Sequence, residues 1–436
     1  MDWYNLVSGI GLVLCMGLAW LFSTNRRLIN WRLILWSLTF QLLFALFVFL
    51  VPAGSRMFLA VNDLVVVMLD SATAGAKFVF GRLALPPGST NAAGETSLGF
   101  ILAFQALPTI IFFSALMAML YYLGIMQLVI RGFAFVFTTC MRLSGAESLS
   151  AASNIFVGIE STLTIRPYLR DMTPSELCTV LTVGMATVAS NVLAVYVFSL
   201  QQQFPTIAGH LISASFLSAP AALIMAKLIY PETDVPQTLG THVRPYYEKE
   251  HNLFEAVIQG ANAGVKLIVG IVALLIAILG LVALVDLGLT AVGKYLNALL
   301  GIQINWSLKG LLGYVFYPLT LILGVPLADV EVVAQIIGGR AIVTEVTAYQ
   351  ELAQAIDQGL LQHPRSILIT TYALCGFAHV ASMAIFVGGL AALIPERANT
   401  VAALGVRALI AATLACLMTA CVAGLFATRG SILLSG

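Results

Sequence analysis

Two apolar segments of the chain each contain a single glutamate and are too short to cross a membrane. The first runs from Glu147 to Arg166 and contains Glu160, and the second follows Gly338 and contains Glu345. A spanning helix needs about 20 apolar residues, and an ionised carboxylate at membrane depth is costly unless a partner, water or a cation stabilises it. We therefore expect two re-entrant hairpins that hold these acids in a functional site, because interrupted segments in two corresponding halves are typical of a transporter's binding site.

The composition identifies the class of protein. Hydrophobic residues make up 60% of the 436 residues and charged residues 9%, with a mean hydropathy of +0.97, whereas soluble domains have roughly 25% charged residues. A net charge of +1 gives no support for nucleic-acid binding, which needs a concentrated basic face. The six cysteines have no metal-site spacing and are interpreted as small buried hydrophobes. The expected partners are the lipid bilayer and a small solute.

Hydropathy predicts an all-α polytopic membrane protein with about eight spans, two opposed re-entrant hairpins and several interfacial helices. Arg26, Arg27 and Arg32 form the densest short basic loop, which the positive-inside rule assigns to the cytoplasm, so both termini are expected in the periplasm. The predicted spans are residues 4–22, 33–52, 100–122, 176–200, a segment ending near 227, 264–286, 366–394 and 401–427. Interfacial helices are expected at 62–82, about 131–142 and from 253, a polar linker at 231–252, and short broken helices over 287–330.

Small and polar residues predict breaks within two of the spans. The fourth span contains the cluster Gly184–Asn191, and the seventh is interrupted at Cys375–His379 and at Gly388-Gly389. Because one hairpin enters from each side of the membrane, the two halves are expected to form an inverted repeat. The resulting division is residues 1–122 as N-terminal scaffold, 123–230 as the first half of a transport domain, 231–330 as linker and scaffold, and 331–436 as the second half.

Several side chains in these segments have chemistry suited to a small solute or a cation. Carboxylates accept several hydrogen bonds at once, so Glu160 and Glu345 suit the hydroxyls of a sugar, although ion pairs with nearby arginines remain an alternative. His379 is either a structural donor or a proton relay. Oxygens of Asn154, Thr187 and Ser190 could bind a small cation together with backbone carbonyls freed by a broken helix, or bond neighbouring helices instead.

The chain resembles the concentrative nucleoside transporter family from about residue 100 to the end. The motifs that carry the resemblance occur in the family's order and are Glu147-Ser148, Asn154-Ile-Phe-Val-Gly158, Arg166-Pro-Tyr-Leu169, Leu311-Leu-Gly-Tyr314, Thr344-Glu-Val-Thr-Ala-Tyr349, Ala373-Leu-Cys-Gly-Phe-Ala378 and Pro395-Glu-Arg397. The resemblance implies a homotrimeric, cation-coupled symporter whose transport domain moves past a fixed scaffold, which is an elevator-type mechanism.

The resemblance also implies roles for individual residues. Substrate contacts fall on Glu160, Val192, Glu345, Phe377 and Ser382. Sodium ligands fall on Asn154, Val157, Thr187 and Val188. The chain departs from the family at three positions, because Ile159 stands where the family has polar base-reading groups, and Thr344 and His379 replace asparagines. We therefore expect weak discrimination between bases and binding dominated by the sugar.

The expected function is a sodium-coupled symporter that imports nucleosides or a nucleoside-like solute across a bacterial inner membrane, with no enzymatic activity and no cofactor besides the coupling ion. A proton-coupled carrier for another polyhydroxy or modified-nucleoside substrate is the alternative, since His379 leaves room for proton coupling. A channel is less favoured, because two opposed hairpins with one acid each suit a closed, alternating site better than a pore.

Overall fold

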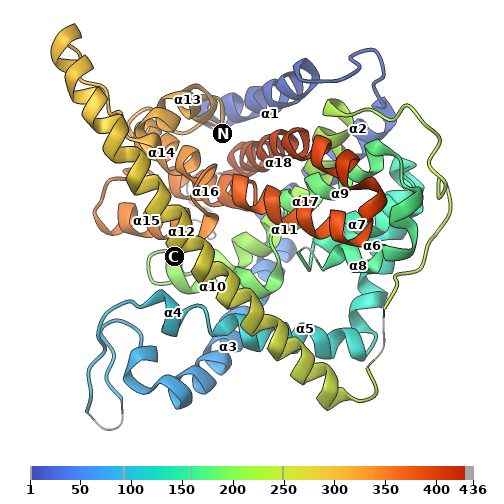
Figure 1. Cartoon of the computed structure of the whole chain (residues 1–436), viewed down its shortest axis with the longest axis horizontal. Helices are drawn as coiled ribbons and strands as arrows, with labels where there is room; N and C mark the ends of the chain where they lie inside the picture. Colours follow the sequence, from blue (N-terminus) through green and yellow to red (C-terminus); the bar gives the residue numbers. More distant parts are fainter. Residues whose placement is uncertain (1, 92–93, 159, 248–249, 428–436) are drawn as a thin grey trace.

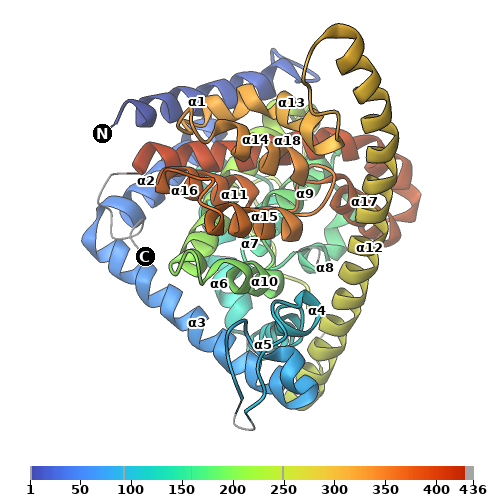
Figure 2. The same ribbon diagram turned by 90° about the vertical axis from the view of Figure 1, so that its left-hand side faces the viewer.

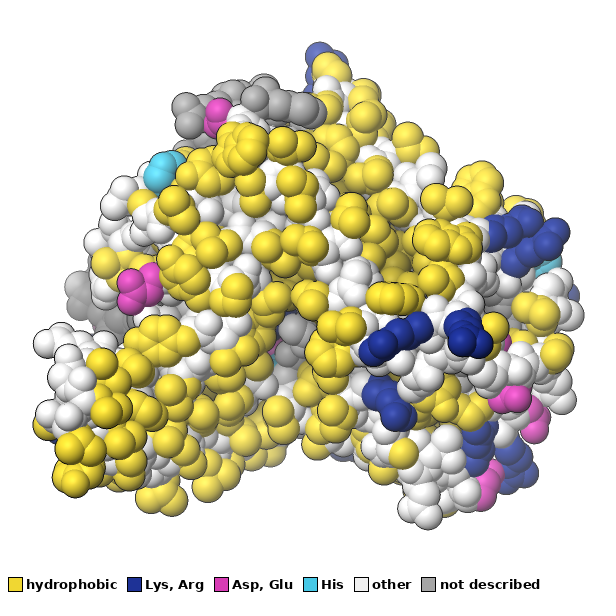
Figure 3. Space-filling view, turned by 90° about the horizontal axis from the view of Figure 1, so that it is seen from above, with side chains coloured by type: hydrophobic (Ala, Val, Ile, Leu, Met, Phe, Trp, Pro, Cys, Tyr) yellow, Lys and Arg dark blue, Asp and Glu magenta, His cyan; other side chains and the backbone are white. Residues whose placement is uncertain are grey.

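The computed structural model describes residues 2–91, 94–158, 160–247 and 250–427, and these are almost entirely helical (Figure 1). Eight helical segments in this part of the chain are long and apolar enough to cross a membrane. Hydrophobic side chains also cover much of the outer surface seen in Figure 3, as expected where lipid is the solvent. These observations confirm the predicted all-α polytopic fold.

The N-terminal helices are α1 (Trp3–Leu21), α2 (Trp31–Leu50) and α3 (Pro52–Phe80). α1 and α2 match two predicted spans and pack against α18 and α11. The interfacial helix predicted at 62–82 is instead part of α3, which begins at Pro52. Proline at the first helical position is favourable because its fixed φ suits the helix and its missing N–H would have no partner there. α3 is long and apolar enough to span, so it is one of the eight candidates.

α12 (Leu253–Leu300) has 48 residues and is the longest helix in the described part of the chain. The predicted division into a helix from 253, a span at 264–286 and short broken helices over 287–330 is wrong as far as residue 300, since no proline interrupts the stretch 253–300 and the helix is continuous. At 1.5 Å per residue it is about 72 Å long, and it crosses the whole molecule in Figures 1 and 2. The shorter helices on either side of it in the chain are α4 (Leu102–Gln105), α5 (Thr109–Tyr122), α6 (Ile125–Met141) and α13 (Leu308–Ile322). Of these, α5 packs along α12, whereas α6 packs mainly on α7 and α13 on α14.

The remaining helices form two series with the same order: a hairpin, a broken helix and a continuous helix. The first series is α7 (Gly145–Asn154), α8 (Ser161–Thr164), α9 (Pro174–Ala186), α10 (Ser190–Leu200) and α11 (Ile207–Ile229). The second is α14 (Val330–Arg340), α15 (Glu345–Asp357), α16 (Pro364–Leu374), α17 (Val380–Leu393) and α18 (Ala398–Phe426). Short 3₁₀ turns lie at Gly81–Ala84, Arg166–Asp171 and Pro395–Arg397. The breaks predicted near 184–191 and at 375–379 are present, but the one predicted at Gly388-Gly389 is wrong because both glycines lie inside α17.

Each hairpin is joined to the broken helix of its own half by the same kind of hydrogen bond. The N–H of Ser190, the first residue of α10, donates to the carbonyl of Phe156, and the N–H of Val380, the first residue of α17, donates to the carbonyl of Ala341; both distances are 3.1 Å. The first N–H groups of a helix have no partner within the helix, and here the turn of a hairpin supplies one. The shared contact supports an internal repeat.

The two breaks also contact each other. Gly376 has φ +124°, and a Cβ at this position would lie 2.6 Å from the carbonyl oxygen of Ala186 at the end of α9. The Cys416 thiol of α18 donates to the carbonyl of Cys375 at 2.9 Å. The backbone of one broken helix therefore lies directly on the other, and only glycine fits at residue 376.

Gly376→Ala should prevent the broken helices from meeting. We expect about 1–3 kcal/mol of backbone strain in addition to the overlap with Ala186, and hence a large fall in the thermal unfolding midpoint of the detergent-solubilised protein. Gly388→Ala is the control, because this glycine is inside α17 with open space around it and alanine favours a helix. Equal midpoints for the two variants would contradict the close approach.

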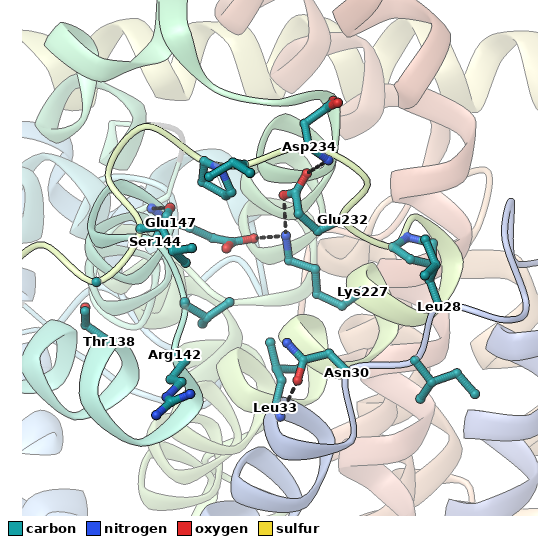
Figure 4. Close-up of a pocket in the computed structure, with 17 residues that line it drawn as sticks. Leu28, Asn30, Leu33, Thr138, Arg142, Ser144, Glu147, Lys227, Glu232 and Asp234 are labelled. Atoms are coloured by element: carbon teal, nitrogen blue, oxygen red, sulfur yellow. Dashed lines mark hydrogen bonds and ion pairs between the residues drawn. The ribbon is translucent and has the colours of Figure 1, made fainter.

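The base of the first hairpin is held by a buried cluster of charges around Lys227, at the wall of a cavity of about 550 Å³ (Figure 4). The Nζ atom of Lys227 lies 2.7 Å from Glu147 and 3.4 Å from Glu232, and donates to the Ser175 hydroxyl at 2.9 Å. Ser144, which caps α7, donates in turn to Glu176. These bonds connect the hairpin to α9, α11 and the linker, so they fix where it starts.

Lys227→Met should leave Glu147 buried without its partner, which typically costs about 3–5 kcal/mol. The thermal midpoint should therefore fall clearly, and the double variant with Glu147→Gln should recover part of the loss. Lys309→Met is the control, since the Lys309–Glu351 pair is partly exposed and such pairs contribute about 0–1 kcal/mol. A Lys227→Met protein as stable as the control would show that the cluster does not hold the hairpin.

Candidate functional site

A cavity of about 110 Å³ lies where the two hairpins, the two broken helices and α12 meet. It brings together seven of the substrate residues expected from the sequence, although they come from segments more than 200 positions apart. These are Glu160, Val192, Thr344, Glu345, Phe377, His379 and Ser382. The eighth, Ile159, lies outside the described residues. The cavity is narrow because aliphatic side chains of α12 close one side of it: Leu267, Ile271, Leu274 and Leu275.

Glu345 is the most constrained acid of the cavity. Thr344 is the N-cap of α15, so Glu345 is its first residue, where a negative charge is stabilised by the helix dipole. One carboxylate oxygen accepts a hydrogen bond from the Tyr196 hydroxyl at 2.8 Å, and the other lies 2.7 Å from Nε2 of His379. The residue is 4% exposed. Each oxygen has a second lone pair, so the carboxylate can still accept hydrogen bonds from a ligand.

His379 has a structural role that also fixes its orientation. It is the N-cap of α17, and its Nδ1 accepts the backbone N–H of Ser382 at 3.2 Å. Because Nδ1 is an acceptor in this bond, the proton of the neutral ring is on Nε2, which faces Glu345. The Ser382 hydroxyl donates to the carbonyls of Phe377 and His379. Protonation at Nδ1 would remove the helix cap.

Glu160 differs from Glu345 because its side chain is exposed. It borders the cavity described above and also a second cavity of about 450 Å³ toward the linker. The second cavity is lined by Tyr121 and Tyr247, whose rings stack with centroids 5.9 Å apart, and by Glu250. Burial and the hydrogen bond to Glu250 raise the pKa of Tyr247, so its hydroxyl remains a donor at neutral pH. Glu160 therefore lines both cavities.

The expected sodium ligands lie where the turn of the first hairpin contacts the break of α9 and α10. Asn154 ends α7 and is fully buried; its Nδ2 donates to the Ser150 carbonyl at 2.9 Å, while its Oδ1 has no hydrogen-bond partner among the described residues. Thr187 caps the end of α9. The Ser215 hydroxyl of α11 donates to the carbonyl of Ile155 at 2.8 Å and lies 3.5 Å from that of Val188. Val157, also in the turn, lines the second cavity.

A buried oxygen that accepts no hydrogen bond is suited to bind a cation. Carbonyl and amide oxygens are the ligands that hard cations prefer, and the C-terminal end of α9 adds a partial negative charge. Because Ser215 bridges the hairpin turn and the break, it positions both backbone segments that carry the expected carbonyl ligands.

Sequence reasoning missed three polar residues of this region. Tyr196 was counted only as part of an apolar span, although it bonds Glu345 and stacks on Tyr349 with centroids 4.7 Å apart. Asn191 lines the cavity, and its Oδ1 has no partner within the described residues. Ser215 looked like one of many small helix residues. For Tyr196 and Asn191 the available signal was the number of polar residues in 187–196; Ser215 had no such signal.

Models of sodium-dependent nucleoside transporters match nearly the whole chain. The model described as "Na+ dependent nucleoside transporter N-terminus" matches residues 10–83, that of the C-terminus matches residues 210–424, and one described as "Nucleoside recognition" matches residues 103–203. Nucleoside permease NupC of Helicobacter pylori is 36% identical over 97% of this chain and 98% of its own length. The chain belongs to the concentrative nucleoside transporter family. This family consists of transporters and not of enzymes.

Other members are similar over the same length. A transporter of Haemophilus influenzae is 39% identical over 98% of this chain and 99% of its own. Mouse solute carrier family 28 member 3 is 38% identical over 97% of this chain, but the chain spans only 59% of the mouse protein. The transporter CNTnw in an inward-facing, substrate-bound state superposes with a TM-score of 0.86 at 35% identity, covering 97% of this chain and 98% of that one. A CNTnw double variant in an outward-facing state gives 0.87 at 34%, covering 98% of each chain.

Proposed function

We propose that this chain is a sodium-coupled symporter that imports nucleosides by an elevator-type, alternating-access movement. The observation that carries the proposal is the Glu345 carboxylate, held by Tyr196 and His379 at a cavity formed by both hairpins and both broken helices. A carboxylate with free lone pairs at the N-terminus of a helix can accept hydrogen bonds from the two neighbouring hydroxyls of a ribose.

The proposed pose places the ribose at Glu345, His379 and Ser382, and the base toward Phe377, Val192 and Glu160. Hydrogen bonds to a charged group contribute about 1.5–3 kcal/mol each, so the ribose would supply most of the binding energy. The aromatic ring of Phe377 and the aliphatic chain of Val192 can contact any base. This supports transport of both purine and pyrimidine nucleosides, with deoxyribose analogues bound more weakly.

Sodium is the coupling ion in this proposal, bound by Asn154, Thr187 and the carbonyls of Val157 and Val188. The orphaned Oδ1 of Asn154 and the family's sodium dependence support this assignment. The geometry of His379 weighs against a proton in its place, because Nδ1 is committed to capping α17. Sodium at this position would also join the first hairpin to the break beside the substrate, which couples ion binding to substrate binding.

The elevator movement is supported by the contact between α12 and the cavity. Four aliphatic side chains of α12 border the site, so the hairpins could slide past it without breaking hydrogen bonds to them. We assign α5 and α12 to the fixed part, and the hairpins, the broken helices, α11 and α18 to the moving part. α1 and α2 pack on α11 and α18, so we place them in the moving part too, although residues 1–122 were expected to form scaffold. We also propose that the protein forms a homotrimer in a bacterial inner membrane, with both termini in the periplasm.

Glu345→Gln should reduce sodium-driven uptake of radiolabelled uridine and adenosine into proteoliposomes by at least about tenfold, because one lost charge-assisted bond is worth about 1.5–3 kcal/mol. Glu160→Gln should reduce it less, since Glu160 is more exposed. The matched control is Glu351→Gln, on the same helix six residues further, where the glutamate pairs with Lys309 away from the cavity. Normal uptake by the Glu345 variant, or accumulation by the wild type without a sodium gradient, would refute the proposal.

Asn154→Ala should raise the sodium concentration for half-maximal uptake about tenfold, since it removes the buried amide oxygen. Ser215→Ala should raise it less, because that hydroxyl only positions the carbonyls of Ile155 and Val188. The readout is uridine uptake over a sodium series at constant ionic strength. Thr413→Ala is the control, since that hydroxyl bonds only within α18. An unchanged sodium dependence in both Asn154→Ala and Ser215→Ala would exclude this site.

A further inference from the structure

The second cavity lined by Glu160 has no part in the proposed function. It measures about 450 Å³, whereas the cavity at Glu345 measures about 110 Å³. Pockets that bind small organic molecules usually measure about 300–1,000 Å³. In this conformation the second cavity is therefore large enough for such a molecule, and the cavity at Glu345 is narrower than it needs.

The second cavity has an aromatic wall. Tyr121, near the end of α5, and Tyr247, in the linker, both line it, and their rings stack with centroids 5.9 Å apart. Every nucleobase has a flat π-face, so stacking on an aromatic side chain accepts any base. The tyrosine pair therefore suits the planar half of a nucleoside.

The hydroxyl of Tyr121 points to a missing partner. Its oxygen is buried but has no hydrogen-bond partner within the described residues. Buried polar side-chain atoms in folded proteins nearly always have such a partner, and a hydroxyl can both donate and accept. A polar ligand in the cavity would supply the bond that this hydroxyl lacks.

The charged residues of the cavity indicate what kind of ligand it accepts. Glu160, Glu250 and Glu255 line it together with Arg166 and His251, so its described side chains carry more negative than positive charge at neutral pH. Carboxylates accept hydrogen bonds from hydroxyls and repel a phosphate. The cavity therefore suits a neutral molecule that combines an aromatic ring with several hydroxyls, and it disfavours a nucleotide.

The cavity lies on the side of the molecule that is expected to be cytoplasmic. The linker begins at the end of α11, where the carbonyl of Ile229 accepts from the N–H of Thr24 at 3.0 Å. Thr24 precedes the basic loop of Arg26 and Arg27, which the positive-inside rule places in the cytoplasm. The linker then returns to the first hairpin, where the N–H of Tyr246 donates to the carbonyl of Thr164 at 2.8 Å.

Both the moving and the fixed part of the proposed elevator contribute to the cavity. Glu160 and Thr164 belong to the first hairpin, whereas Tyr121 is on α5 and Glu255 is on α12. The cavity therefore has all of its walls only while the hairpin is in the position that this structure describes.

We propose that the second cavity is an additional nucleoside-binding site on the cytoplasmic side, in which the base stacks on the tyrosine pair and the ribose bonds the carboxylates. A nucleoside that leaves Glu345 binds there before its release. Glu160, His251 and Gln259 are exposed, so water competes with the ligand and this site is the weaker of the two. The inference rests on the proposed function and adds a second binding step to it.

The test is equilibrium binding of radiolabelled uridine to the detergent-solubilised protein in sodium. The wild type should show a tight and a weak class of sites in equal number. Tyr121→Phe removes a hydroxyl that has no described partner, so it should leave the thermal midpoint unchanged and weaken the weak class about three- to tenfold, as the loss of one hydrogen bond does. Tyr247→Ala should abolish the weak class, whereas Tyr247→Phe keeps the ring and should preserve it.

Two further variants and one competitor distinguish the sites. Glu345→Gln should weaken only the tight class. Tyr295→Phe is the control, because Tyr295 is exposed on α12 and lines neither cavity, so both classes should stay unchanged. Uridine 5′-monophosphate should not displace uridine from the weak class, because its phosphate would meet the carboxylates.

A single class of sites that only Glu345→Gln weakens would overturn the inference and leave the proposed function intact. A weak class that is unchanged in both Tyr121→Phe and Tyr247→Ala, or that the monophosphate displaces as well as uridine does, would also overturn it. Should Tyr247→Ala fail to fold, Tyr121→Phe and the wild-type stoichiometry still decide. A wild type that binds no uridine would refute the proposed function itself, which is a separate result.

Discussion

The structure depends on satisfying the backbone groups of four helices that end inside the protein. α9 and α16 end at the breaks, and α10 and α17 begin there, so carbonyls and N–H groups are freed at a depth where lipid offers no hydrogen bonds. Part of the solution is local, such as the His379 cap of α17. The rest comes from the hairpin turns, which accept from Ser190 and Val380. Each hairpin turn therefore lies where a broken helix has a backbone N–H that needs a hydrogen-bond acceptor.

The same arrangement concentrates electrostatic potential at the candidate site. The positive ends of α10 and α17 and the negative ends of α9 and α16 lie on either side of the breaks, so an electronegative solute and a cation can each find a suitable helix end. Glu345 lies at this crossing on α15, and its two partners, Tyr196 and His379, are held there by α10 and by the start of α17. The polar residues are few, because the helix ends themselves supply much of the field.

The sequence predicted the hairpins and the broken helices better than it predicted the helices around them. Glycine and small polar residues revealed the breaks near 187 and 375, and single acids in short apolar segments revealed both hairpins. The long helix α12 was divided wrongly near residues 264 and 286, because a span was given the usual length of about 20 residues and a continuous helix of 48 residues is rare. The count of eight spans was confirmed, but the eight helices differ, since α3 is long enough while the two halves of the broken segment 364–393 are each too short.

The site residues could be recognised from the sequence in two ways, by their chemistry or by the family resemblance. Glu160, Glu345 and His379 stand out by chemistry alone, whereas Val157, Val188 and Val192 could be named only through the family resemblance, because backbone carbonyls and aliphatic contacts leave no chemical mark on a sequence. Lys227 and Tyr196 escaped both approaches. Each acts through a partner that is more than 70 positions away in the chain, at Glu147 and Glu345 respectively, and only the folded chain reveals such pairs.

The strength of the contacts also differs across the molecule, and this difference decides which parts can move. The first hairpin is tied to α9 and α11 by the Lys227 cluster, and the second to α16 by Arg340, all through buried polar bonds that would be costly to break. α12 meets the cavity through Leu267, Ile271, Leu274 and Leu275 instead. Aliphatic surfaces can exchange one apolar neighbour for another at little cost, since dispersion contacts are individually weak and not directional. In the proposed elevator movement, the hairpins would therefore carry the broken helices with them and slide along α12.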